Sequence, residues 1–266
     1  MDRESAGYPG VPYVFDIRRG STNDGPGIRS VAFFKGCGLD CRWCHNPEGK
    51  APLPQPAFFA GRCEGCGACA EVCPSTGGCV ACGRCAEVCP SGARKIYGRK
   101  YTAEELAGIL AADAPFYVAA GGGATFSGGE CMLYPGYLAD TARLLKERGV
   151  NVAADTAGYV PYPNFEAVLP YVDLFLYDIK CLDPVLHRRG TGADNALILE
   201  NLEKLIRTGK DIVIRTPEIP GFNDGAELER VRAYCAARGL PHEVLPYHTF
   251  GEDKKAALEA ARRPRR

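Results

Sequence analysis

The stretch Cys37-Gly38-Leu39-Asp40-Cys41-Arg42-Trp43-Cys44 places three cysteines in a C-x3-C-x2-C pattern, directly after an apolar run over residues 30–35. The apolar run predicts a buried strand, so the three thiols fall on the loop that leaves its carboxyl end. Three closely spaced thiolates suit a 4Fe-4S cluster, which usually takes four ligands, so that one iron would stay open for an amine and a carboxylate. A zinc site completed by His45 is the alternative interpretation of the same spacing.

The composition narrows the possible classes of protein. The chain has 266 residues with 32 basic and 32 acidic side chains, so its formal net charge is zero and nothing suggests a nucleic-acid partner. No run approaches the ~18 consecutive apolar residues of a membrane span, and residues 1–6 lack the apolar core of a secretory signal. We therefore expect a cytoplasmic protein without a membrane anchor. Its 14 cysteines are then poor candidates for disulfides and good candidates for metal ligands.

Alternating strand and helix patterns predict the architecture. Six short apolar segments are interleaved with helical patterns, which predicts a parallel sheet with right-handed crossovers. Because six units are too few for a closed eightfold barrel, we expect an α/β fold with an open, partial (β/α)6 barrel and active groups at the carboxyl ends of its strands. A short extended stretch is expected at residues 11–17. The predicted strands cover residues 30–35, 124–127, 151–155, 172–179, 211–216 and 242–246, and the predicted helices cover residues 103–112, 135–148, 163–169, 195–208 and 226–238.

Residues 55–100 are rich in cysteine, glycine and proline and poor in long apolar segments. They repeat a C-x2-C-x2-C-x3-C-P spacing, which is typical of paired 4Fe-4S clusters of the bacterial ferredoxin type. In that arrangement the fourth cysteine of each run ligates the cluster of the other run; a zinc knuckle is the alternative. The expected ligand sets are Cys63, Cys66 and Cys69 with Cys89, and Cys79, Cys82 and Cys85 with Cys73.

The two cysteine runs are separated only by residues 74–78, too few for the two strands and the turn of an ordinary ferredoxin, which leaves the ligand pairing open. We divide the chain into three parts. Residues 1–54 form the first part of the barrel with the three-cysteine loop, residues 55–100 form a ferredoxin-like insert, and residues 101–266 form the rest of the barrel with a short C-terminal tail.

Polar and charged residues stand at the predicted carboxyl ends of the strands. Gly128, Gly129 and Glu130 follow the second strand, where glycines allow a ligand to approach closely and a carboxylate can accept hydrogen bonds from an ammonium group. Each feature alone also fits a turn or a surface ion pair, but their common placement favours one shared site. The further groups at strand ends are Asp155, Asp178, Lys180, Arg215 and His248, and the isolated thiols expected to be buried and inert are Cys131, Cys181 and Cys235.

Taken together, these motifs resemble the radical S-adenosylmethionine (SAM) enzymes, whose three-cysteine pattern has an aromatic residue before its last cysteine. The hexapeptide Asp-Gly-Pro-Gly-Ile-Arg at residues 24–29 and the run Cys44-His45-Asn46-Pro47-Glu48 are similar to those of glycyl radical enzyme activating enzymes. The insert resembles that of the subgroup that activates decarboxylases, dehydratases and C–C or C–N lyases. The resemblance covers roughly residues 11–252 and continues through residues 125–130, 155–156, 178–180, 219–224 and 245–248.

The resemblance implies roles for the matched positions. Cys37, Cys41 and Cys44 would ligate the cluster that chelates SAM, and the backbone at Trp43 would meet the adenine. Gly128, Gly129 and Glu130 would hold the SAM amino group, while Lys180, Arg215 and His248 would lie around its carboxylate and ribose. Asp155 and Asp178 would match a monovalent-cation site beside the carboxylate.

The implied reaction is the reductive cleavage of SAM to methionine and a 5′-deoxyadenosyl radical, which takes a hydrogen atom from a backbone glycine of a partner glycyl radical enzyme. The resemblance also implies three 4Fe-4S clusters, a low-potential electron donor such as flavodoxin or ferredoxin, and anaerobic conditions. It further implies an activase that is monomeric on its own. Two rival functions are a radical SAM enzyme that acts on another substrate, such as a peptide, and an electron-transfer iron–sulfur protein that cleaves no SAM.

Two features depart from the family pattern. Cys131 and Tyr134 stand where the family usually has proline and glutamine. The family also continues for tens of residues beyond Gly251, whereas this sequence reaches only Arg266 through a basic segment. We therefore expect an incompletely covered edge at the last strand of the barrel, and a solvated helix end in the basic segment.

Overall fold

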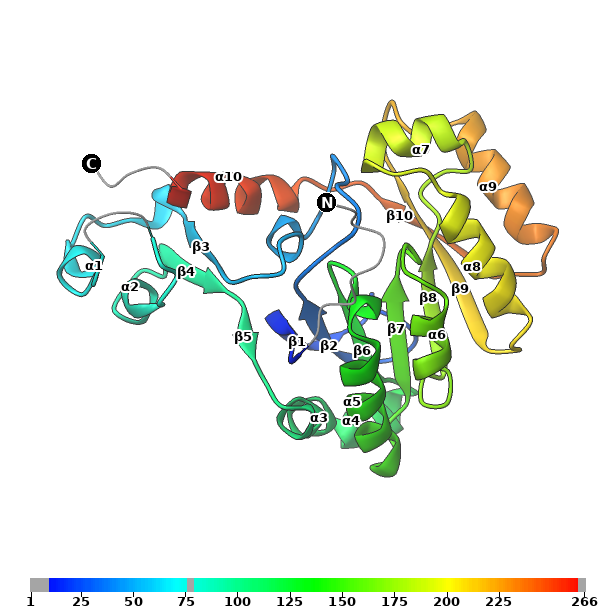
Figure 1. Cartoon of the computed structure of the whole chain (residues 1–266), viewed down its shortest axis with the longest axis horizontal. Helices are drawn as coiled ribbons and strands as arrows, with labels where there is room; N and C mark the ends of the chain where they lie inside the picture. The colour runs from blue at the N-terminus through cyan, green and yellow to red at the C-terminus, as the bar shows by residue number, and fades with distance from the viewer. Residues whose placement is uncertain (1–9, 76–78, 263–266) are drawn as a thin grey trace.

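The computed structural model describes residues 10–75 and 79–262 of the chain (Figure 1). Among these residues, eight strands form the main sheet in the order β10-β9-β8-β7-β6-β2-β1-β5. All six predicted strands are confirmed as its parallel part, and each pairs with its neighbour in that order. The parallel strands are β2 (Arg29–Phe34), β6 (Gly123–Gly128), β7 (Val152–Thr156), β8 (Leu174–Asp178), β9 (Asp211–Glu218) and β10 (His242–Pro246).

Two antiparallel strands extend the sheet beyond β2. The extended segment expected at residues 11–17 forms β1 (Tyr13–Ser21), which pairs with β2, and β5 (Arg99–Lys100) pairs with β1 in turn. At the opposite edge, β10 pairs with β9 on one side, and no strand of the described residues pairs with its other side.

Helices cover the outer face of the sheet. The five predicted helices are confirmed, and the first begins with the capping box formed by Thr102 and Glu105. Side chains of alternate strand residues, such as Phe126 and Phe175, pack under these helices, whereas Asp155 and Arg215 point to the concave face. The five predicted helices are α3 (Ala103–Ala111), α5 (Pro135–Glu147), α6 (Pro163–Val168), α8 (Ala196–Ile206) and α9 (Ala226–Ala236). The sequence did not predict α4 (Ala114–Ala120) and α7 (Pro184–Thr191), and α10 (Phe250–Arg262) follows the last strand.

The insert is built from two similar halves beside a small sheet. Its strands β3 (Gln55–Phe58) and β4 (Arg94–Tyr97) pair antiparallel, and its helices α1 (Ala68–Glu71) and α2 (Arg84–Glu87) each follow a glycine in the left-handed region. The described residues between the two cysteine runs contain no strand, as the short linker predicts, and residues 76–78 of that linker lie outside the described part. The remaining elements are short 3-10 helices, η1 (Pro47–Gly49), η2 (Ala60–Arg62) and η3 (Cys131–Leu133).

Helix α10 follows the last strand of the sheet and packs against the insert. It starts after β10 and lies along β3 (Figure 1). Its residues Ala257 and Leu258 are buried in a small core with Phe15, Phe33 and Tyr97. The expected helix in the basic segment is therefore present, but one of its faces is packed; residues 263–266 lie outside the described part. No helix in the described ranges is long and apolar enough to cross a membrane.

Candidate active site

A cavity of about 910 Å³ opens on the concave face, at the carboxyl ends of the parallel strands. Parallel strands bring residues that are distant in sequence to one edge, which is why loops after β2, β6, β7, β8, β9 and β10 can share its wall. All the residues predicted for the SAM site line it, with the exception of Glu130. They are Cys37, Cys41, Trp43, Cys44, Gly128, Gly129, Asp155, Asp178, Lys180, Arg215 and His248.

The three-cysteine loop is fixed by backbone contacts to α7. The amide of Asp40 donates to the carbonyl of Thr191 at 2.7 Å, and the amide of Arg42 donates to the carbonyl of Gly190 at 3.0 Å. Glycine is required at residue 190, since a Cβ there would lie 2.7 Å from the ring of Trp43. The Lys50 ammonium also donates to the carbonyl of Cys41 at 2.8 Å. These contacts tie the loop to α7 and to Lys50.

Burial makes the three thiols poor anions on their own. Burial raises the pKa of Cys37 and Cys44 above that of a free thiol, and raises that of Cys41 to about 11. Thiolates in such a place need a cationic centre to compensate for the lost hydration, and a metal cluster supplies one. The donor set therefore fits an iron–sulfur cluster bound by three cysteines.

Gly128 and Gly129 are required by close packing of the backbone. A Cβ at Gly129 would lie 2.2 Å from the carbonyl oxygen of Gly36 and 2.5 Å from that of Gly49. Gly128 has a φ of +120°, and a Cβ there would lie 2.2 Å from the amide of Phe34. The turn after β6 thus packs directly against the segments that precede and follow the three-cysteine loop. The sequence pattern located this turn correctly, but it did not reveal the contact.

Glu130 lies behind the cavity wall. Its side chain is 1% exposed, and its carboxylate accepts hydrogen bonds from the Thr156 hydroxyl at 2.7 Å and from the amides of Met132 and Ala157. Burial raises the pKa of Glu130 to about 7. In the structure this carboxylate positions Thr156 and Ala157, which line the cavity.

Two carboxylates in the cavity are each matched by a cation. Lys180 donates to Asp178 at 2.8 Å; burial alone would lower the pKa of Lys180, but the Asp178 carboxylate raises it. Arg215 lies 3.5 Å from Asp155, whose other oxygen accepts from the Ser127 hydroxyl at 2.7 Å. Burial raises the pKa of Asp155 to about 6 despite the opposing effect of Arg215. The cations Lys180 and Arg215 can therefore bind an anionic group in the cavity.

Two histidines beside Cys44 form a stacked pair. The ring centroids of His45 and His248 lie 3.8 Å apart, and the Phe250 ring packs against His248 at a tilt, with a centroid distance of 4.7 Å. The buried Nε2 of His45 and Nδ1 of His248 have no hydrogen-bond partner, although both residues line the cavity. Burial, together with the neighbouring His248, lowers the pKa of His45 to about 4. Sequence reasoning considered His45 only as a zinc ligand and missed Phe250, for which no motif gave a signal.

The isolated cysteines are packing residues. Cys131, Cys181 and Cys235 are each no more than 1% exposed, as predicted, and burial raises the pKa of all three thiols.

Tyr134 stands at a position where the family usually has glutamine. Its hydroxyl donates to the carbonyl of Lys35 at 2.5 Å.

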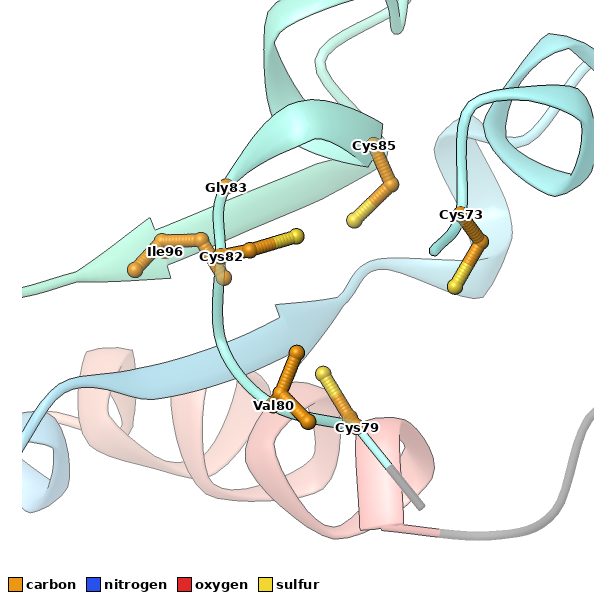
Figure 2. A pocket seen from close by; sticks show the side chains of 7 residues that line it. All are labelled: Cys73, Cys79, Val80, Cys82, Gly83, Cys85 and Ile96. Carbon is orange, nitrogen blue, oxygen red and sulfur yellow. The ribbon is translucent and has the colours of Figure 1, made fainter. Parts of the chain in front are cut away.

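The second cysteine run of the insert surrounds a small pocket together with one cysteine of the first run. Figure 2 shows the sulfur atoms of Cys73, Cys79, Cys82 and Cys85 directed toward a common space beside Val80 and Ile96. This is the grouping that crossed ligation of two clusters requires. The four cysteines thus fit a 4Fe-4S cluster. In the described residues, no three His, Cys, Asp or Glu side chains are gathered tightly enough for a single metal ion.

The chain belongs to the radical SAM superfamily, whose sequence pattern matches residues 31–234. It is 37% identical to the isethionate sulfite-lyase activating enzyme of Nitratidesulfovibrio vulgaris, over 97% of this chain and 89% of that protein. It is also 37% identical to the trans-4-hydroxy-L-proline dehydratase activating enzyme of Clostridioides difficile, over 91% of this chain and 86% of that protein. The benzylsuccinate synthase activating enzyme of Thauera aromatica is 36% identical, over 94% of this chain and 83% of that protein.

A solved structure supports the fold. Streptococcus suis SuiB bound to its precursor peptide SuiA has a TM-score of 0.55 and 12% identity to this chain, covering 82% of this chain and 39% of SuiB. At that identity the likeness concerns the fold alone. Together with the family match, it confirms the predicted α/β fold of the radical SAM type.

Proposed function

We propose that the chain is a radical SAM activase that abstracts a hydrogen atom from a backbone glycine of a glycyl radical enzyme of the decarboxylase, dehydratase or lyase type. The observation that carries this proposal is the convergence of the three-cysteine loop and the strand-end cations on one cavity. The three relatives named above, each of them an activating enzyme, support the same function.

The three-cysteine loop binds the cluster. Cys37, Cys41 and Cys44 serve as its thiolate ligands, and the cluster and SAM together supply the electron transfer and the radical fragment that this chemistry needs. The protein orients these groups through the loop contacts to α7 and keeps bulk water from the reacting atoms. The indole of Trp43, packed 4.2 Å from the ring of Phe222, shapes the loop backbone that meets the adenine.

The strand-end groups bind the rest of SAM. Lys180 and Arg215 are cations in a buried setting, and we assign the SAM carboxylate to them. Gly128 and Gly129 present backbone to the SAM amino group, and Glu130 orients the neighbouring wall. His248 contacts the ribose, while Asp155 and Asp178 offer oxygens to a monovalent cation. Cations with matched carboxylates keep their charge at any physiological pH, which suits them to an anionic ligand.

The insert holds two further 4Fe-4S clusters in this proposal, which brings the total to three. Cys79, Cys82 and Cys85 with Cys73 ligate one of them, supported by the pocket of Figure 2, and Cys63, Cys66 and Cys69 with Cys89 ligate the other. These clusters receive electrons from a low-potential donor such as flavodoxin or ferredoxin. The activase works in the cytoplasm under anaerobic conditions and is monomeric until it meets its partner.

The test is anaerobic reconstitution followed by reduction in the presence of SAM. We expect about twelve iron and about twelve sulfide per chain and the formation of 5′-deoxyadenosine, which is lost when any one of Cys37, Cys41 and Cys44 is replaced by alanine. Formation of 5′-deoxyadenosine that persists in these variants would contradict the proposal. An electron-transfer protein would bind iron but cleave no SAM.

A further inference from the structure

A buried network of charged side chains connects the three-cysteine loop to α10. The Glu48 side chain is 2% exposed and lies four residues after Cys44, in η1. Its Oε1 accepts an ion-pair contact from Lys254 of α10 at 2.7 Å. The Lys254 ammonium also donates to the carbonyl of His45 at 3.2 Å and to Oδ1 of Asn46 at 3.1 Å. The Lys254 side chain therefore contacts three residues, His45, Asn46 and Glu48, in the segment that follows the third cysteine.

The start of α10 also packs on the third cysteine itself. A Cβ at Gly251 would lie 2.4 Å from the carbonyl oxygen of Cys44 and 3.1 Å from Cα of His45, so the helix backbone touches the loop directly. One turn later Lys254 reaches back to Glu48. Together, these contacts fix the backbone of residues 44–48.

The network reaches the insert through a second cation, Lys35, which is buried. Lys35, which is fully buried at the end of β2, donates to the carbonyl of Glu48 and to the Gln55 side chain, the latter at 3.1 Å. Gln55 is the first residue of β3, and α10 lies along β3 (Figure 1). The end of β2, the segment after the third cysteine, the insert and α10 therefore meet at Glu48.

We infer that Glu48 and Lys254 are positioning residues that hold the carboxyl-side segment of the three-cysteine loop, and with it Cys44, in the geometry that binds SAM. This inference rests on the proposed function, because it assumes that the loop carries the SAM-binding cluster. Removal of Lys254 leaves the buried Glu48 carboxylate without its compensating charge, and the segment that carries Glu48 must rearrange to hydrate it.

Positioning can be distinguished from a simple charge effect by the direction in which two substitutions change the affinity for SAM. Glu48→Gln removes a negative charge and Lys254→Met removes a positive one, so any direct electrostatic effect on SAM affinity would be opposite in the two variants. Loss of positioning acts in the same direction in both. Lys255→Met is the matched control, because Lys255 lies next in α10 and is exposed.

Two measurements on the anaerobically reconstituted full chain test the inference. We expect both Glu48→Gln and Lys254→Met to raise the Kd for SAM about tenfold and to speed hydrogen exchange in residues 41–50. Lys255→Met stays at the wild-type values, and Lys254→Arg, which keeps the charge, stays within about threefold. Unchanged exchange in residues 41–50 in both variants, or opposite shifts in Kd, would overturn the inference.

The design separates this inference from the proposed function. If the wild-type protein cleaves no SAM, the proposed function fails, while hydrogen exchange still reports whether the two side chains hold the loop. If Glu48→Gln does not fold, Lys254→Met decides the matter together with Lys254→Arg, because the Lys254 side chain is 25% exposed and its loss disturbs the core less.

Discussion

The substitution Gly129→Ala tests the contact between the turn after β6 and the three-cysteine loop. The new methyl group would lie 2.2 Å from the carbonyl oxygen of Gly36 and 2.5 Å from that of Gly49. Carbon and carbonyl oxygen atoms normally stay about 3.3 Å apart or more, so these two backbone segments must move by about 1 Å. Both segments flank the loop that carries Cys37 and Cys44, and the loop must move with them.

The cost can be worked out from the contacts that are disturbed. Overpacking of this kind costs about 1–3 kcal/mol in the free energy of unfolding. The amide of Gly36 donates to the carbonyl of Gly49 at 2.7 Å, and the amide of Glu130 donates to the carbonyl of Gly36 at 2.7 Å. Losing one of these hydrogen bonds adds about 1 kcal/mol, for a total of about 2–4 kcal/mol. A misplacement of about 1 Å at a reacting group slows a reaction by about 100-fold.

The assay compares Gly129→Ala with Gly136→Ala. A Cβ at Gly136, in α5, meets nothing within 4 Å, so this control is expected to keep wild-type activity and to gain up to about 1 kcal/mol of stability. We measure denaturant unfolding and the rate of 5′-deoxyadenosine formation for both variants. If Gly129→Ala matches the wild-type protein in stability and rate, the close approach described for this turn is not present.

Three further predictions follow from the charged groups and the insert. Lys180→Met leaves the Asp178 carboxylate without its cation and lowers the free energy of unfolding by about 3–5 kcal/mol. Denaturant unfolding of the double variant with Asp178→Asn is expected to show that part of this loss is restored. Because the pKa of Asp155 is raised to about 6, the folded chain holds a proton that the unfolded chain has released, and the free energy of unfolding therefore falls as the pH rises from about 4 to 6. In Asp155→Asn, we expect unfolding measured over this pH range to show a flatter dependence. A pH dependence as steep as that of the wild-type protein would contradict the raised pKa of Asp155. Cys79→Ala lowers the iron content by about four per chain while SAM cleavage with an artificial reductant continues, and an unchanged iron content would refute the ligand assignment.

The parallel part of the fold was predictable because most of its strands are largely buried and rich in apolar residues. All six residues of β2 are buried and the last four are apolar, so this strand stands out from the polar turns around it. The strand β1 gave only a short extended signal because its second half is exposed, and its antiparallel pairing depends on contacts with β2 that no local pattern encodes. Helix α10 was expected only as a solvated helix end, since its packing depends on the insert.

The site was predictable to the level of its location. The ends of parallel strands must meet at one edge, so residues such as Asp155, Lys180 and Arg215 could be assigned to one cavity from their places in the sequence. Which side chains face the cavity depends on tertiary contacts. Glu130 turns away from it to bind Thr156 and Ala157, and His45 faces it through stacking on His248. Sequence spacing carries no information about these contacts.

The central claim is that the chain generates a radical on a glycine of a partner enzyme. The most direct measurement is electron paramagnetic resonance of the reconstituted chain mixed with SAM, a reductant and each glycyl radical enzyme encoded in the same genome. We expect a glycine-centred radical signal in one of these enzymes, dependent on SAM and absent with Cys41→Ala. Cleavage of SAM without such a signal in any of them would contradict the claim and favour a radical SAM enzyme with a different substrate.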